Sequence, residues 1–422
     1  RTLIRRVTYA LTGLPPTPEK VAKFLNDESP QAYEALVEEL LASAHYGEHW
    51  ARHWLDVARY SDTKGYVYAR EERNWVHAWG YRDWVIQALN KDMPYDRFLL
   101  LQLAADQVVD PHAEDLLAMG FLTLGRRFLG VQRDIIDDRI DVVCRGMLGL
   151  TVSCARCHDH KYDPIPTADY YSLYGVFNSC IESLDAIHPP GDKEAEDEVL
   201  EQRKSALREA LREARTNASN RACNRVADYL FAQSELDKYP ANGFDQIFQP
   251  EDLLPEFVRS WQRALRHAEQ TSDPVFMAWL AFAKLDAADF QAQAVAVTQQ
   301  LAQSSPEQCN ALVRQAFEQP PTSFREVCDR YGLLFTEVQA EWMKLLSAAD
   351  GQGTQPPSAL PNPAAEALRG AVLGKNAACQ VPAGGIYNLE TYFDSDTVTK
   401  LWKLQAEVDR RIMELGGSHR HA

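Results

Sequence analysis

The chain has 422 residues, a formal net charge of −16 at pH 7 and a sequence pI near 5.2. This acidity argues against nucleic acid, or an anionic membrane surface, as the main partner. Hydrophobic residues make up 45% and charged residues 25% of the chain, as in an ordinary globular protein. No apolar run approaches the roughly 18 residues that a membrane span requires. We therefore expect no nucleic-acid ligand and no membrane span.

The first part of the chain predicts a series of helices separated by proline-rich turns. Thr17 is placed to cap a helix that begins at Pro18, and Ser29-Pro30 repeats this pattern before a helix with an apolar face. Further helices are expected over 48–60, 81–90, 137–150 and 169–177, and after Pro94 as far as Leu103. Strand-like alternation is scarce, so the predicted fold class is mainly α.

From about residue 191 the pattern changes to a second helical region. Residues 194–218 are densely charged and carry leucines near heptad spacing, which indicates a long exposed helix or half of a helical hairpin. Later helical segments are expected over 250–270, 275–303, 306–318, 322–348 and 396–415, the last a candidate partner for the long helix, with a linker near 350–363. We divide the chain into a helical domain, 1–190, and a helical extension, 191–422.

Residues 154–158 spell Cys-Ala-Arg-Cys-His, the C-x-x-C-H attachment motif of a c-type haem. The thiols of Cys154 and Cys157 are spaced to add to the two vinyl groups of one porphyrin, and His158 then ligates the iron as proximal ligand. With 8 Cys and 11 His in the chain, chance would produce roughly 0.004 such pentapeptides. The alternatives are a redox C-x-x-C or half of a zinc site, but zinc needs a second ligand pair and no other C-x-x-C occurs. We expect one covalent haem c.

The axial position of that iron opposite His158 is either occupied by a side chain from another part of the sequence or open. His160 stays on the same side of the porphyrin as His158, so we interpret it as a propionate partner or an acid/base group, or else as a capping residue. His53 shares a helical face with His49 and Asp56, which makes His53 a candidate distal ligand or proton-transfer base. Methionine ligation and an ordinary amphipathic helix are the alternatives for this position.

Other charged and aromatic groups surround these positions. We expect Arg59 to pair with a haem propionate or with a carboxylate such as Asp56 or Asp62. The candidate catalytic residues are thus His53, Asp56, Arg59 and His160. Residues 46–84 are unusually aromatic, which suits sugar stacking, haem packing or a plain core. The acidic segment 137–141 is either an ion-pair network or a source of catalytic acids.

Six cysteines lie outside the motif. In an oxidising compartment they allow up to three disulfides, and the sequence does not choose among the fifteen full pairings. Free buried thiols are the alternative. These residues are Cys144, Cys180, Cys223, Cys309, Cys328 and Cys379.

Several longer motifs, in the same order along the chain, carry a family resemblance. They are Leu-Thr-Gly-Leu-Pro-Pro-Thr-Pro from residue 11, the tryptophan- and histidine-rich 46–60, Tyr-Arg-Asp-Trp-Val-Ile from 81, Pro-Tyr-Asp-Arg-Phe from 94, and 148–165 around the haem motif. Together they resemble a cytochrome-associated, uncharacterised domain family abundant in planctomycetes, over about residues 1–180. Recurrent polar positions of that family fall on His53, Asp56, Arg59 and His160, whereas His49 stands where an arginine is expected.

The resemblance implies a periplasmic or secreted haem protein, from organisms that degrade complex polysaccharides. It also implies further N- and C-terminal domains in the parent protein, which we expect to lie outside this chain. We therefore predict an exported c-type haem redox protein, an oxidoreductase or electron carrier linked to carbohydrate oxidation, with a redox partner protein or an additional cytochrome domain. The alternatives are a pure electron-transfer module and a carbohydrate-binding or structural protein in which haem is only a staple.

Overall fold

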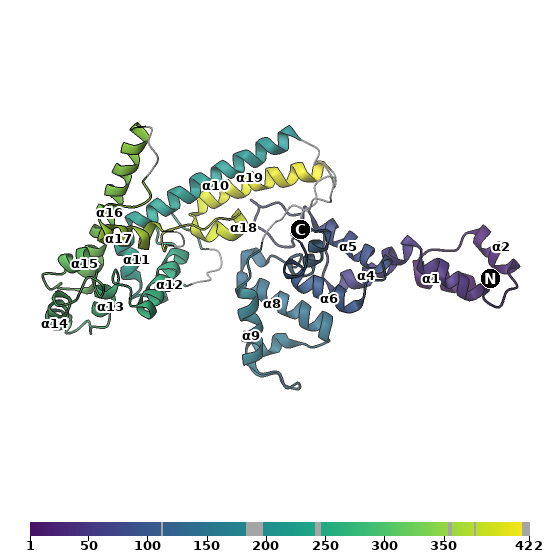
Figure 1. Ribbon diagram of the computed structural model, residues 1–422. Coiled ribbons are helices and arrows are strands. Elements are labelled where there is room, and N and C mark those ends of the chain that lie inside the picture. Colours follow the sequence, from purple (N-terminus) through teal and green to yellow (C-terminus); the bar gives the residue numbers. More distant parts are fainter. Residues whose placement is uncertain (111–112, 183–196, 241–245, 353–356, 375–376, 416–422) are drawn as a thin grey trace. The chain divides into compact units, whose positions relative to one another are not determined.

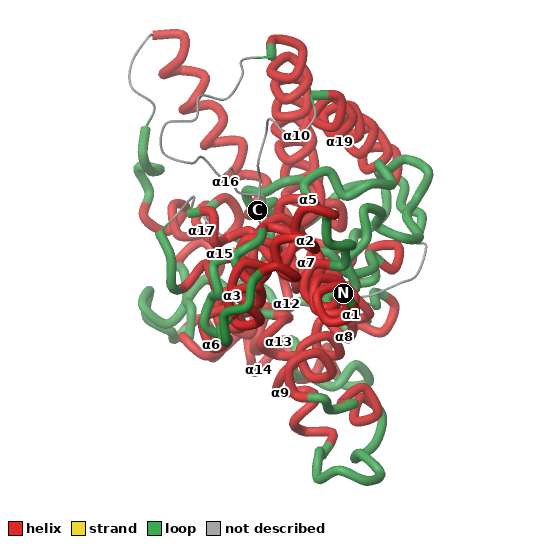
Figure 2. Tube along the Cα trace, turned by 90° about the vertical axis from the view of Figure 1, so that its right-hand side faces the viewer, coloured by secondary structure: helices red, strands yellow, loops and turns green. Residues whose placement is uncertain are grey.

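The computed structural model describes all residues except 111–112, 183–196, 241–245, 353–356, 375–376 and 416–422 (Figure 1). Helices and loops account for every described residue apart from an isolated β-bridge between Thr63 and Asn74, as Figure 2 shows. The prediction of a mainly α fold is confirmed. The chain divides into two compact units, unit 1 with residues 1–204 and 403–422, and unit 2 with 205–402. The predicted domain boundary near residue 190 falls outside the described residues.

Unit 1 begins with three helices, α1 (Thr2–Thr12), α2 (Pro18–Asn26) and α3 (Ala32–Leu41), around a small apolar cluster. Thr17 caps α2 as predicted, because its hydroxyl accepts a hydrogen bond from the Lys20 backbone N–H at 3.3 Å. The predicted cap at Ser29 is wrong. The Ser29 backbone N–H donates instead to the Asp27 carboxylate at 3.0 Å, which shapes the turn, and α3 starts later.

The core of unit 1 is aromatic. It is formed by α4 (Ala44–Val57), α5 (Ala78–Asn90), α6 (Tyr95–Ala104) and α7 (Gly120–Thr123), with short 3₁₀ turns at Ala105–Gln107 and Glu114–Met119. The Trp54 ring stacks on Phe121, and its indole N–H donates to the Gln102 side-chain carbonyl at 2.7 Å. Tyr81 donates to the same oxygen at 2.7 Å. Trp54, Tyr81 and Trp84 of the aromatic segment are therefore part of the core.

Helix α8 (Gln132–Val143) leads to the motif through an irregular turn. The predicted helix over 137–150 is wrong at both ends, since α8 starts earlier and passes into a π-helical turn, Cys144–Leu148, which ends at Gly149 with φ 68°. A side chain at Gly146 would meet Val57 Cγ1 at 2.8 Å, so only glycine lets α4 approach this turn. A 3₁₀ turn, Val152–Arg156, and α9 (Thr167–Asn178) follow.

Unit 2 is a helical array with one continuous core. Its helices are α10 (Glu198–Asn224), α11 (Val226–Ala232), α12 (Pro255–Thr271), α13 (Met277–Phe282), α14 (Phe290–Ala302), α15 (Ala311–Ala316), α16 (Phe324–Gln352), α17 (Pro363–Leu373), α18 (Ile386–Leu389) and α19 (Ser395–Glu414). Short 3₁₀ turns lie at Leu236–Lys238 and Glu390–Tyr392. Helix α10 begins in unit 1 and α19 ends in unit 1. The helix predicted over 275–303 is two helices, because the Asp286 carboxylate accepts the Ala288 N–H at 2.9 Å in an intervening turn.

The long helix predicted from the charged segment is α10, and its partner is α19. Arg203 donates to the Glu407 carbonyl at 2.7 Å, and Arg221 makes an ion pair with Asp394 at 2.8 Å. Figure 1 shows the two helices side by side. The hairpin-like pairing expected from the sequence is therefore confirmed. Within the described ranges, none of the helices combines the length and apolar character that crossing a bilayer demands.

Candidate functional site

The C-x-x-C-H motif lies on a turn whose two sides differ in burial. Val152 and Ala155 point inward, and Ala155 is 0% exposed against an apolar cluster that includes Tyr170. Cys154 and Cys157 are three residues apart, so a 3₁₀ turn places them on the same side, and both are exposed. The buried alanine thus anchors the turn while the two thiols reach the surface.

The imidazole of His158 is held by its own loop. Its Nδ1 lies 2.8 Å from the Asp159 backbone carbonyl oxygen, which only accepts hydrogen bonds, so Nδ1 carries the proton. This tautomer leaves Nε2 as the nitrogen available to a ligand, and the residue is exposed. Metal-binding histidines are commonly oriented by a hydrogen bond of this kind from the other ring nitrogen.

Arg156, the second variable residue of the motif, fastens the turn to α8. Its guanidinium makes ion pairs with Asp134 at 3.0 Å and with Asp137 at 3.1 Å. Tyr170 of α9 donates to the same Asp137 carboxylate at 2.7 Å, and burial together with this bond raises the pKa of Tyr170. The motif therefore sits between two helices that share one carboxylate.

The acidic segment before the motif is an ion-pair network. Besides Asp137, Asp138 binds Arg59, and Asp141 accepts from Arg145 at 2.8 Å and from Ser153 at 3.2 Å. Because each carboxylate already has a cationic or hydroxyl partner beside the motif, the geometry favours a positioning role over the catalytic-acid alternative.

Arg59 is engaged within the fold. Its side chain is half-buried and makes an ion pair with Asp138 at 2.6 Å, while its Nη1 donates to the Phe121 carbonyl at 3.3 Å. The residue has a φ of 59°, an unusual backbone conformation for a non-glycine residue. The predicted pairing with Asp56 or Asp62 is wrong. Asp138 lies 79 positions away in the sequence, so local spacing carried no signal for it.

His160 uses its ring to hold the loop that follows the motif. The Nδ1 atom accepts the backbone N–H of Asp163 at 2.9 Å and that of Tyr162 at 3.3 Å, so it carries no proton. The Nε2 atom faces the Thr151 hydroxyl at 3.4 Å, and the side chain is only 7% exposed. These contacts show that His160 positions the loop that follows the motif.

The side chains of His49, His53 and Asp56 were predicted to share one face of a helix, which is α4 in the structure, and this face does not contact the motif as a whole. His53 and Asp56 are exposed, and no hydrogen bond or ion pair joins either to the motif among the described residues. The contact of Val57 with Gly146, one turn beyond His53, brings this end of α4 beside the turn preceding the motif. His49 instead packs against Gly13. A Cβ atom added at Gly13 would lie 2.4 Å from the Nδ1 atom of His49.

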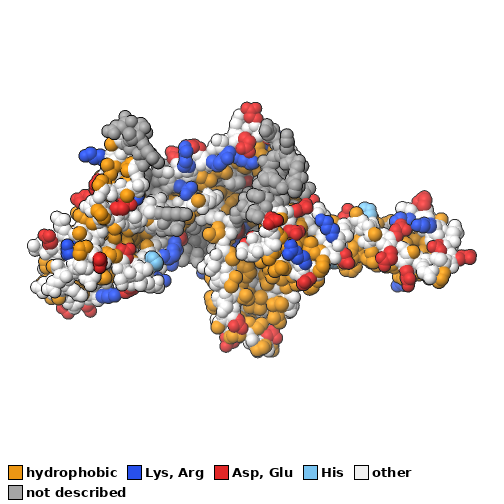
Figure 3. All heavy atoms as spheres, in the orientation of Figure 1, with side chains coloured by type: hydrophobic (Ala, Val, Ile, Leu, Met, Phe, Trp, Pro, Cys, Tyr) orange, Lys and Arg blue, Asp and Glu red, His pale blue; other side chains and the backbone are white. Residues whose placement is uncertain are grey.

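Several apolar side chains are exposed in the segments on either side of the motif and on α9. Leu148 is 64% and Tyr162 is 82% exposed, and Leu150 is exposed as well. Tyr171 of α9 is exposed and donates to the Arg156 carbonyl at 3.1 Å, so its ring belongs to the same surface. Figure 3 shows hydrophobic side chains gathered over α8 and α9. Exposed apolar groups at this density commonly mark a binding surface.

These residues fit a covalently attached haem. Two exposed thiols lie three residues apart on one turn, and the adjacent imidazole offers Nε2. In the part of the chain that the structure describes, no group of three or more His, Cys, Asp or Glu is arranged to hold a metal ion.

Sequence reasoning missed a second ion-pair cluster behind the motif. Glu182 accepts from Arg127 at 3.0 Å and from Arg139, and Arg127 also lies over the Trp75 ring at 5.9 Å. Burial raises the pKa of Glu182, but the two guanidinium groups outweigh it and hold the pKa below its usual value. The three residues are far apart in sequence, so no local pattern could have shown the cluster.

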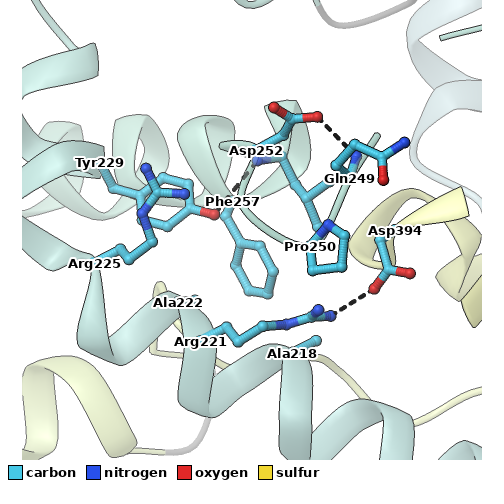
Figure 4. Close-up of a pocket in the computed structure, with 11 residues that line it drawn as sticks. Ala218, Arg221, Ala222, Arg225, Tyr229, Gln249, Pro250, Asp252, Phe257 and Asp394 are labelled. Carbon is cyan, nitrogen blue, oxygen red and sulfur yellow. Dashed lines mark hydrogen bonds and ion pairs between the residues drawn. The ribbon is translucent and has the colours of Figure 1, made fainter. Parts of the chain in front are cut away.

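A hollow in unit 2, drawn in Figure 4, does not form a ligand site of its own. Its two arginines are already paired, Arg221 with Asp394 at 2.8 Å and Arg225 with Asp228 at 3.0 Å. The carboxylate of Asp252 accepts the Gln249 backbone N–H at 2.7 Å. The polar groups around this hollow therefore satisfy one another.

Fold and site together define a class of protein, an all-helical chain with a C-x-x-C-H turn on the surface of its first unit. Residues 1–182 match the model of a family described as PSCyt2, protein of unknown function (DUF1549). The matched range agrees with the extent of the resemblance seen in the sequence. No curated protein and no solved structure matches the chain.

Proposed function

We propose that residues 154–158 attach one haem c and that unit 1 serves as an electron-transfer module. The observation that carries this proposal is the turn itself, with Cys154 and Cys157 exposed on one side and Ala155 buried on the other. When bound, the haem supplies a one-electron carrier. Because c-type haem is attached outside the cytoplasm, the proposal includes a periplasmic or secreted location.

The residues of the chain have separate tasks in this proposal. Cys154 and Cys157 would hold the haem, each by one thioether bond formed when its S–H group adds across a vinyl group. His158 offers Nε2 to the iron because its Nδ1–H is bound to the Asp159 carbonyl. Arg156 and Ala155 would hold the turn in place against α8 and α9 beneath an exposed cofactor.

The geometry favours electron transfer over sugar oxidation as the primary role. Several rings of the aromatic segment that suggested a sugar platform belong to the core, with Trp54 and Trp84 packed against Phe98. Trp50 and Tyr66 are the exposed rings that remain for a carbohydrate, and oxidation of a sugar stays a prediction. An exposed cofactor suits exchange of electrons with a redox partner protein or another cytochrome domain.

His53 is our candidate for the far axial position. It lies exposed on α4, one turn before the residue that contacts the π-helical turn leading to the motif. Asp56 lies three residues after His53 on the same helix and is our candidate for proton transfer with it. The matched control is His49, which shares the helical face but packs against Gly13.

The test is the absorption spectrum of the purified protein, oxidised and dithionite-reduced, with and without carbon monoxide. We expect a reversible redox change and resistance to carbon monoxide in the wild type and in His49→Ala, and carbon monoxide binding in His53→Ala. Reduction of the haem by members of a panel of mono- and oligosaccharides would favour the enzyme. A haem with no accessible redox couple would contradict electron transfer and favour the staple alternative.

A further inference from the structure

Two cysteines far apart in the sequence meet in the core of unit 2. Cys223 lies near the end of α10 and Cys379 in the loop between α17 and α18. They are 2% and 0% exposed and belong to one apolar cluster. The two side chains interact directly. Burial, followed by the neighbouring Cys223 thiol, raises the pKa of Cys379 well above its usual value.

Hydrogen bonds fix the loop of Cys379 along α10 independently of the thiols. The Val381 backbone N–H donates to the Ser219 hydroxyl at 3.1 Å, and the Val381 carbonyl accepts from Arg215 at 3.3 Å. Arg215, Ser219 and Cys223 are spaced by four residues, so they lie on one face of the helix. Since the loop is bound to that face at Val381, Cys379 is held next to the following turn, where Cys223 lies.

The other buried thiols have different surroundings. Burial raises the pKa of Cys328 to about 12, and the groups that modify it further are Trp279 and two charged residues. Burial also raises the pKa of Cys309 and of Cys144, and in each case the nearby group is charged rather than a cysteine. Among the described residues, the pair of Cys223 and Cys379 stands apart.

We propose that Cys223 and Cys379 form a structural disulfide when the chain folds in an oxidising compartment. The oxidant is a disulfide of another molecule, such as glutathione disulfide or a protein thiol oxidant. One cysteine thiolate attacks that disulfide and forms a mixed disulfide, and the second cysteine then displaces the remaining thiol. The two S–H groups become one S–S bond, and two protons and two electrons pass to the oxidant, which leaves as two thiols.

Because both thiols are buried, the Cys223–Cys379 disulfide has to form at a particular stage of folding. Neither thiol is open to solvent in the folded chain, so exchange has to precede closure of the core. The disulfide would therefore resist reductants in the native state. It would tie α10 to a loop that is remote in sequence, and restriction of the unfolded chain would raise stability.

Refolding the full chain tests the pairing. The denatured and reduced protein is refolded with oxidised and reduced glutathione, quenched with N-ethylmaleimide under denaturing conditions, and digested for peptide mapping. We expect one linked peptide pair that joins Cys223 to Cys379, with Cys309 and Cys328 recovered as alkylated thiols. Recovery of Cys223 and Cys379 as alkylated thiols, or linked to other cysteines, would overturn the proposal.

A second measurement uses the sensitivity of unfolding to dithiothreitol. The urea midpoint of the oxidised wild type should fall when the unfolding series contains dithiothreitol, and the Cys309→Ala control should behave in the same way. The double variant Cys223→Ala/Cys379→Ala should lose that dithiothreitol dependence. An equal dithiothreitol effect in the double variant would overturn the proposal, and the wild-type peptide map decides the matter if that variant does not fold.

Discussion

The guanidinium of Arg156 lies 3.1 Å from the carboxylate of Asp137, which ties the residue between the two motif cysteines to α8. Tyr170 of α9 reaches the same carboxylate from the other side. The turn that carries the exposed thiols is thus held by contacts of Arg156 and Tyr170 with Asp137. Rigid placement of reactive groups depends on such supporting contacts. This relationship makes the motif turn testable by substitutions that touch neither cysteine.

Arg156→Met removes both ion pairs of the motif arginine. We expect the free energy of unfolding of unit 1 to fall by about 1 kcal/mol, since these side chains are one-quarter to one-third exposed and solvent weakens the interaction. The fraction of chains that carry covalent haem should also be lower in this variant. The control is Arg133→Met, whose exposed guanidinium lies 3.9 Å from Asp134. Equal urea midpoints for the two variants would contradict the anchoring role.

Ala155→Leu tests the buried side of the turn. The added carbons have no room against Tyr170, so we expect a loss of about 1–3 kcal/mol in the free energy of unfolding. Ala168→Leu places the same change at an exposed position of α9 and should be nearly neutral. Chemical denaturation of both variants is the measurement. A neutral Ala155→Leu would show that the turn does not depend on this packing.

His160→Ala should loosen the loop after the motif. The Asp163 amide, which donates to the His160 ring at 2.9 Å, is expected to exchange its hydrogen faster in this variant. His160→Asn keeps an acceptor oxygen at similar reach and should restore part of the protection. Amide exchange measured residue by residue distinguishes the three proteins. Unchanged exchange at Asp163 in His160→Ala would rule out the positioning role.

Glu182→Gln should change stability in a pH-dependent way. The folded pKa of Glu182 is lower than the ordinary value of 4.5, so the folded state binds fewer protons at this site than the unfolded state. Its contribution is complete above about pH 4.5 and is lost as the pH falls through the folded pKa. We expect the variant to lose ~2 kcal/mol at pH 7, where one partner of a largely buried ion-pair cluster is neutralised.

The measurement is a urea titration of both proteins at pH 7 and near pH 4. The difference in unfolding free energy between wild type and Glu182→Gln should narrow at the lower pH, because the Glu182 carboxyl of the unfolded wild-type chain begins to bind a proton there while the folded one stays ionised. A gap that stays constant or widens toward acid would contradict the assignment of this carboxylate to Arg127 and Arg139.

Helices could be predicted from the sequence where local chemistry decides them. Thr17 with Pro18 marked the start of α2 because the cap is a contact between near neighbours. The turn at Cys144–Leu148 could not be predicted, because it depends on the approach of Val57 to Gly146 from a distant helix. The split between α13 and α14 was missed for another reason, because the local turn at Asp286 lies inside one apolar pattern.

The candidate site shows the same division. The motif itself could be recognised from the spacing of Cys154 and Cys157, and haem attachment stays a prediction. Its anchors were not predictable, since Arg156 finds its partners in a helix some twenty residues earlier and Arg59 finds Asp138 across the fold. Long-range ion pairs leave no periodic signature in a sequence. The charges of 137–141 therefore remained ambiguous until the fold was known.

The most direct test of the central proposal is the mass of the denatured protein after production with a c-type haem maturation system. We expect the wild-type chain to carry the added mass of one haem that survives acid–acetone extraction, located on the peptide with Cys154 and Cys157. Cys144→Ala should keep the haem, and Cys154→Ala/Cys157→Ala should lose it. A wild-type chain without covalent haem, or a double variant that retains it, would contradict the account.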